Sequence, residues 1–140
     1  DYSREEQLFA ESLCREGRMC VLPYDRDWHV QPSPHDERLQ AEKVLGAIST
    51  EAVYLTLDVD GLDPAYMPAT GTPVSGGLSW DFVRALIAEL FEKKEVIGAD
   101  VVEVAVRDPN RLDHAERLTV RNAAQLVYDM IACRARSSIS

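Results

Sequence analysis

The chain has 140 residues, enough for one domain with a hydrophobic core, and its 46% hydrophobic and 28% charged residues are typical of a globular protein. A net charge of -9 without any basic block argues against nucleic acid or an anionic membrane as partner and suits a cationic ligand. No apolar run is long enough for a membrane span. The three cysteines lack zinc-site spacing, which indicates free thiols in a reducing compartment and predicts the cytoplasm.

The first part of the chain predicts two helices and a short strand. Ser3, followed by acidic residues, is typical of a helix N-cap, and Gly17 ends the helical spacing that follows. The apolar run over residues 19–22 predicts a strand. The proline-rich residues 24–34 predict a loop, and apolar residues at helical spacing predict a helix over residues 36–48.

The remainder of the chain alternates strands with helices. The expected elements are a strand over 52–58, a helix from a Ser79 cap to Lys94, a strand over 96–106, a turn over 107–112, a helix over 115–133 and a frayed tail over 134–140. Such alternation predicts an α/β fold with a parallel sheet covered by helices on both faces. In these folds, ligands bind beyond the carboxyl ends of the strands.

Two aspartates at the end of the strand over 52–58 are candidate metal ligands. Asp58 and Asp60 are two residues apart, so on a strand their carboxylates would point to one face and repel each other. A divalent cation between them would offset this repulsion. By itself, an Asp-x-Asp pair is more often a turn with side-chain hydrogen bonds. The long loop over residues 63–77 follows directly, and its position after a strand favours a functional role.

The run from Asp58 to Leu78, DVDGLDPAYMPATGTPVSGGL, closely resembles the second metal-binding signature of the ureohydrolase family, which includes arginases and agmatinases. The resemblance implies a three-layer α/β/α fold with a mainly parallel sheet and two Mn²⁺ ions per active site. It implies that Asp58 and Asp60 are metal ligands. It also implies that Thr72, in the loop PATGTP, lies close to the guanidinium group of a small cationic substrate, while Asp63 shapes the turn.

Glu103 is a single acid in an apolar strand, where burial is costly unless the carboxylate is paired. Considered alone, it could be an edge-facing or salt-bridged residue. The family has an acid in an equivalent valine–glutamate–valine strand, so the resemblance implies that Glu103 hydrogen-bonds the substrate guanidinium. The implied reaction is hydrolysis of a guanidino compound to urea and an amine. Asp60 is the candidate for assisting proton transfer to the leaving amine.

Two further metal signatures of the family, of the types G-G-D-H and D-A-H-x-D, do not occur in this sequence. The 140 residues are therefore expected to be the C-terminal part of a single ureohydrolase domain, with its own N-terminal half as a candidate partner. The isolated chain is expected to be inactive. The histidines stand in no ligand pattern; they are His29, His35 and His114.

The segments around Glu103 and over residues 112–116 and 123–128 look more like agmatinases, which predicts hydrolysis of agmatine to putrescine and urea. Arginase or another guanidino-acid hydrolase is the alternative. An alternative of another class is a non-catalytic protein of the same fold with a binding or regulatory role. The resemblance also implies a homo-oligomer, a trimer or a hexamer.

Overall fold

The structure, a computed structural model, describes residues 3–20, 22 and 34–137, with the backbone alone for residues 34–37. The chain divides into two compact units, Asp1–Val30 and Gln31–Ser140. Among the helices of the described residues, none combines the length and the apolar composition that crossing a membrane requires.

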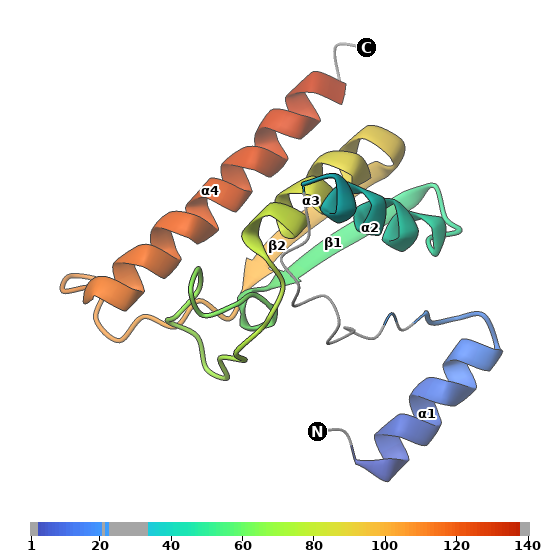
Figure 1. Ribbon diagram of the computed structural model, residues 1–140, viewed down its shortest axis with the longest axis horizontal. Helices are drawn as coiled ribbons and strands as arrows, with labels where there is room; N and C mark the ends of the chain where they lie inside the picture. The colour runs from blue at the N-terminus through green and yellow to red at the C-terminus, as the bar shows by residue number, and fades with distance from the viewer. Residues whose placement is uncertain (1–2, 21, 23–33, 138–140) are drawn as a thin grey trace. The chain divides into compact units, whose positions relative to one another are not determined.

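Helix α1, Arg4–Arg15, lies in the first unit (Figure 1). Its start is a capping box, in which the amide of Glu6 donates to Ser3 Oγ at 3.2 Å and the amide of Ser3 donates to Glu6 Oε2 at 2.8 Å. Gly17 follows the helix with a positive φ of 69°, a conformation that glycine adopts without steric cost. The predicted cap and stop are both confirmed.

The strand predicted over residues 19–22 is wrong where the structure describes it, because residues 19, 20 and 22 belong to no strand. A strand requires a neighbour that satisfies its backbone groups. The described sheet consists of two other strands, so this apolar run has no partner in it. Residue 21 and the loop predicted over 24–34 lie outside the described residues, except that Pro34 already begins a helix.

The sheet of the second unit is a parallel pair, β1 (Ala52–Asp58) and β2 (Glu95–Val102). Asp58 at the end of β1 lies opposite Val102 at the end of β2, so the two carboxyl ends meet at one edge. The strand predicted over 96–106 is therefore too long. It ends at Val102 because Glu103 has a positive φ of 64°, which breaks the extended backbone.

Three helices belong to the same unit: α2 (Pro34–Gly46), α3 (Trp80–Lys93), which contacts β2, and α4 (His114–Ser137). Helix α3 contacts both α2 and α4 and lies between them in Figure 1. Along β1 the apolar residues Val53, Leu55 and Leu57 are less exposed than the residues that alternate with them. The α/β class with a parallel sheet is confirmed. The core is formed by Ala41, Leu45, Val59, Leu62, Met67, Phe82, Val83, Ile87, Leu90, Phe91, Val96, Ala123, Leu126 and Met130.

The ends of α3 and α4 test two further predictions. Ser79 caps α3 as expected, with its Oγ accepting the amide of Phe82 at 3.0 Å. Helix α4 continues through residues 134–137, which were predicted to fray. The hydroxyl of Ser137 donates to the carbonyl of Phe91 at 2.9 Å, and this bond ties the end of α4 to α3.

The loop between β2 and α4 is organised by Glu116. This buried carboxylate accepts the amide of Arg107 at 3.0 Å and the amide of Asp113 at 2.8 Å, and it pairs with the Arg107 guanidinium at 3.1 Å. The two backbone hydrogen bonds, with the Arg107 guanidinium, lower the pKa of Glu116 to about 2. The loop therefore returns to the start of α4 in a fixed conformation.

Candidate functional site

Asp58 is the last residue of β1, and Val59–Gly61 form a single 3₁₀ turn, η2. Asp58 caps this turn, because its Oδ1 accepts the amide of Asp60 at 2.9 Å. The strand predicted over residues 52–58 is confirmed. Asp60 lies beyond its end, in the turn, so the two acids do not share a strand face. The turn is anchored by Val59, which is fully buried. The Asp58 side chain is therefore joined to the backbone of Asp60 by a cap, and strand alternation does not set the relation of the two residues.

Asp60 is bound to the loop predicted to contact the substrate. Its Oδ2 accepts the backbone amide of Thr72 at 3.2 Å and also the Thr72 hydroxyl. Its Oδ1 is buried, and no group among the described residues donates to it. A carboxylate oxygen removed from water without a donor is costly unless a cation lies next to it. Asp60 thus has one oxygen that holds the loop and one that is left for a ligand.

Asp63 uses both of its oxygens within the turn. Its Oδ1 accepts the amide of Ala65 at 2.8 Å, and its Oδ2 accepts the amide of Gly76 at 2.8 Å. Because Gly76 is thirteen residues further along the chain, one carboxylate closes the whole loop after β1. These contacts support the structural role expected for Asp63.

The two ends of this loop are held together by a close backbone contact at Gly77. The amide of Leu78 donates to Gly61 O at 2.8 Å, and the amide of Asp63 donates to Leu78 O at 3.1 Å. A Cβ on Gly77 would lie 2.6 Å from the carbonyl carbon of Leu62 and 2.8 Å from the amide nitrogen of Asp63. Both neighbours are backbone atoms, so no side chain can rotate away.

We expect Gly77→Ala to reduce the free energy of unfolding of the complete protein by about 1–3 kcal/mol, the usual cost of forcing an extra methyl group into a packed site. Gly46→Ala is the matched control, because a Cβ at the end of α2 meets nothing within 4 Å and its φ is not positive. It should be neutral or stabilise by up to about 1 kcal/mol. Urea denaturation of both variants would measure this difference, and equal midpoints would contradict it.

Glu103 is, among the described residues, the one non-glycine residue with a positive φ. Backbone strain of this kind persists where the surroundings impose it, and it is frequent at functional sites. The position of a Cβ on Gly71 lies 3.9 Å from Glu103 Oε2, so the carboxylate lies beside the loop that contains Thr72. Glu103 is exposed, so its carboxylate avoids the cost of burial and is open to a ligand.

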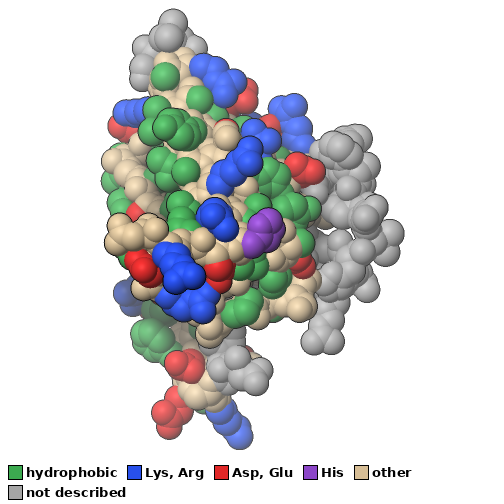
Figure 2. Space-filling view, turned by 90° about the vertical axis from the view of Figure 1, so that its left-hand side faces the viewer, with side chains coloured by type: hydrophobic (Ala, Val, Ile, Leu, Met, Phe, Trp, Pro, Cys, Tyr) green, Lys and Arg blue, Asp and Glu red, His purple; other side chains and the backbone are tan. Residues whose placement is uncertain are grey.

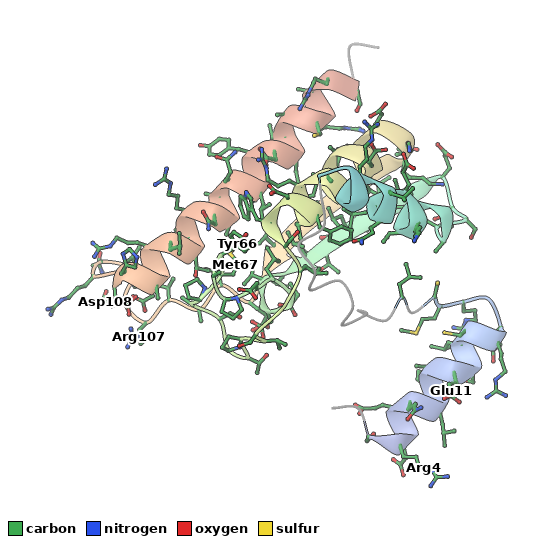
Figure 3. The ribbon with its side chains drawn as sticks, viewed as in Figure 1. Arg4, Glu11, Tyr66, Met67, Arg107 and Asp108 are labelled. Carbon is green, nitrogen blue, oxygen red and sulfur yellow. The ribbon has the colours of Figure 1, made fainter. Side chains whose placement is uncertain are left out.

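The loop over residues 68–73 joins these groups. It contacts Asp60 through Thr72, Glu103 beside Gly71, and the segment after β2 through a hydrogen bond from the amide of Ala105 to Ala69 O at 3.0 Å. Figure 3 labels Tyr66 and Met67 in this loop region and Arg107 and Asp108 in the loop before α4. The chain therefore places the predicted residues around one loop, at the carboxyl ends of two parallel strands.

The oxygen donors at this edge fit a hard divalent cation. Carboxylates are the side chains that Mn²⁺ and Mg²⁺ prefer, and Asp60 Oδ1 is buried without a donor among the described residues. Asp58 and Asp60 can therefore supply part of a ligand set. Within the described residues, no three His, Cys, Asp or Glu side chains are grouped closely enough to hold a metal ion. His114 begins α4; His29 and the side chain of His35 lie outside the described residues.

Comparison with known proteins identifies the family. The family model described as the arginase family matches residues 31–133. This chain belongs to the arginase family. The arginase-like α/β fold is supported by solved structures of known relatives. A hypothetical agmatinase from Burkholderia thailandensis has a TM-score of 0.62 and 30% identity over 91% of this chain and 44% of its own. The agmatine ureohydrolase of Thermoplasma volcanium has a TM-score of 0.57 and 32% identity over 82% of this chain and 40% of its own.

Curated relatives of this arginase-family chain are ureohydrolases. An N(1)-aminopropylagmatine ureohydrolase of Thermus thermophilus is 44% identical over 100 residues, which are 71% of this chain and 31% of that protein. An agmatinase of Escherichia coli is 41% identical over 103 residues, 74% of this chain and 31% of that protein. The chain therefore spans about a third of the length of these relatives.

The sequence reasoning missed two residues of α4 that contact the loop after β1. Thr119 Oγ1 accepts the amide of Ala69 at 2.9 Å, and Asn122 Nδ2 donates to the carbonyl of Tyr66 at 2.9 Å. A signal was present in the helical pattern: Thr119 stands in the same register as the buried Ala123, Leu126 and Met130. A polar residue in an apolar register needs a hydrogen-bond partner, and here the partner lies 50 residues away.

Proposed function

We propose that the complete protein containing this chain hydrolyses a guanidino compound to urea and an amine, and that it requires manganese. Agmatine is the substrate we favour, which would yield putrescine. The family match and the names of the curated relatives support ureohydrolase chemistry. Arginine or another guanidino acid is the alternative, since a proclavaminate amidino hydrolase of Streptomyces clavuligerus is 32% identical over 70% of this chain.

The single observation that carries this proposal is the state of Asp60. One of its oxygens is bound by Thr72, while the other is buried without a donor among the described residues. A bound divalent cation would compensate that charge. In this proposal Asp58 and Asp60 hold manganese, which when bound would lower the pKa of a coordinated water and so provide hydroxide at neutral pH.

The chain's own groups have two further tasks in this proposal. The carboxylate of Glu103 and the hydroxyl of Thr72 orient the planar guanidinium, which offers a fork of N–H donors. The exposure of Glu103 beside Gly71 leaves this carboxylate accessible to the substrate. The carboxylate of Asp60 would accept the proton that the attacking water gives up and would deliver it to the leaving amine.

Urea release by the complete protein tests the proposal directly. Agmatine, N(1)-aminopropylagmatine, arginine and a guanidino acid would be compared, with manganese present and after removal of metal with EDTA. N(1)-aminopropylagmatine is included because the relative from Thermus thermophilus carries that name. We expect the highest kcat/KM with agmatine and recovery of activity on adding Mn²⁺. Absence of urea from all four compounds would favour the non-catalytic alternative.

Exposed apolar side chains of the second unit indicate contacts with other protein. Exposed large apolar side chains occur on the sheet, at Tyr54 and Ile97, and along α4, at Val127, Tyr128 and Ile131. Figure 2 views the side of the second unit where α4 lies and shows hydrophobic side chains exposed between basic ones. Such surfaces mark contacts with other protein. We propose that they are covered by the remainder of the protein, the N-terminal half of the domain, and by further subunits of a trimer or hexamer.

We propose that the purified 15.7 kDa chain, without the remainder of its domain, binds no manganese and releases no urea. The free thiols of Cys14, Cys20 and Cys133 support a reducing compartment, and we propose the cytoplasm.

A further inference from the structure

Helix α4 holds residues 66–73 of the loop after β1, here called the substrate loop, through two side chains one turn apart. Thr119 Oγ1 accepts the amide of Ala69 at 2.9 Å, and Asn122 Nδ2 donates to the carbonyl of Tyr66 at 2.9 Å. Residues three apart on a helix lie on the same face, so one face of α4 binds a donor and an acceptor of the same short segment. Thr119 has no exposed surface, whereas Asn122 is half-buried. Of the two hydrogen bonds, the one to Thr119 is therefore the one that is shielded from water.

Ala69 connects helix α4 to the segment that follows β2. Its amide binds Thr119, and its carbonyl accepts the amide of Ala105 at 3.0 Å. Ala105 lies two residues after Glu103, whose positive φ must be imposed by its surroundings. The hydrogen bond between Ala105 and Ala69 fixes the backbone immediately beyond the strained residue. Ala69 therefore holds α4, the substrate loop and the Glu103 segment together.

The other end of the loop leads to Asp60. Thr72, three residues after Ala69, donates its amide to Asp60 Oδ2 at 3.2 Å. Glu103 Oε2 lies 3.9 Å from the Cβ position of Gly71, between these two attachment points. The four residues 69–72 thus span from the buried hydroxyl of Thr119 to the carboxylate of Asp60. A shift at Ala69 would move Thr72 and Glu103 relative to each other.

We propose that Thr119 is a positioning residue, which sets the separation of Thr72 and Glu103 through Ala69 and so sets the fit of the guanidinium group; this rests on the proposed function. Thr119 touches neither substrate nor metal ligand in this role. Its hydroxyl acts through the amide of Ala69, which would otherwise be left unpaired in a partly buried position. A side chain of the same size is not enough to hold Ala69 in place. Valine has the shape of threonine but lacks the oxygen that accepts the Ala69 amide.

The complete protein with Thr119→Val tests this role, with Thr119→Ser and Ser137→Ala as companions. Thr119→Val should raise KM for the guanidino substrate and lower kcat/KM by about tenfold or more, because small displacements of positioning groups are costly. Manganese content should not change, since Asp58 and Asp60 are untouched. Thr119→Ser keeps the acceptor and should recover most of the loss. Ser137→Ala removes a hydroxyl hydrogen bond at the far end of α4 and should leave the kinetics unchanged.

Each outcome decides the proposal. A kcat/KM for Thr119→Val within twofold of the wild type would overturn the positioning role while leaving the proposed function intact. An equal loss in Thr119→Ser, or the same loss in Ser137→Ala, would assign the effect to packing or to general stability. If the wild-type protein releases no urea from any guanidino compound, the proposed function and this role both fail. Should Thr119→Val not fold, Thr119→Cys retains the volume with a poorer acceptor and should give a smaller loss of the same kind.

Discussion

Replacing Asp60 with asparagine in the complete protein is expected to remove manganese and to lower kcat/KM for the guanidino substrate at least 100-fold. Even residues that only support metal ligands typically contribute about 10–100-fold, so loss of a ligand should cost at least the upper end of that range. Asparagine retains an oxygen that can accept from Thr72, so the loop contact survives. The change removes the negative charge at the buried Oδ1, which no described group compensates. Metal analysis and urea release would measure both effects.

Asp58→Ala is expected to abolish manganese binding at one of the two sites. Asp58→Asn separates the role of Asp58 as a metal ligand from its role as a cap. Asparagine caps a turn as well as aspartate does, but it lacks the negative charge of the ligand. Asp81→Asn is the matched control, an exposed acid in the first turn of α3, and it should leave activity and metal content unchanged. Asp60→Asn or Asp58→Ala protein that keeps two manganese ions and normal turnover would show that the end of β1 is not the metal site.

The local features of this fold could be predicted from the sequence because each depends on residues close together in the chain. The Ser3 cap, the Ser79 cap and the run of apolar residues in β1 are all local signals, and all appear in the structure. The signature after β1 is local too, and its residues occupy one loop and the turn before it. Its prolines fix φ at their own positions, and its glycines allow conformations that other residues avoid, such as the positive φ of Gly76, so much of the path of the loop follows from local sequence.

The parts that could not be predicted depend on contacts between distant residues. Period-two alternation would give Asp58 and Asp60 a common face only on a strand, but the side chain of Asp58 caps a turn and the strand ends before Asp60. The apolar pattern of β2 continues past Glu103, yet the backbone leaves the sheet at that residue, beside which the loop over 68–73 lies. The hydrogen bond between Thr119 and Ala69 joins residues 50 positions apart. In the sequence, the one sign of it is a polar residue at an apolar position of the helical pattern.

Glu103→Gln in the complete protein is expected to lower kcat/KM about 10–100-fold while manganese content is retained. Glutamine keeps the length of the side chain and the left-handed backbone, but it replaces a charge-assisted pair with a neutral contact, a loss of roughly 1.5–3 kcal/mol. Glu95→Gln is the matched control, because Glu95 is an exposed glutamate at the start of β2, whereas Glu103 follows its end. Steady-state kinetics with agmatine and metal analysis would separate substrate binding from metal binding.

Glu103→Gly extends this test to the backbone. A non-glycine residue at a φ of 64° carries a steric cost of roughly 1–2 kcal/mol that glycine does not have. We expect Glu103→Gly to lose activity as Glu103→Gln does, yet to unfold at a higher temperature than Glu103→Gln. A variant that loses activity but gains stability would indicate that the strained backbone at Glu103 serves function at a cost in stability. Wild-type kcat/KM in Glu103→Gln would remove Glu103 from the substrate site. A lower melting temperature for Glu103→Gly than for Glu103→Gln would mean that its backbone is not strained.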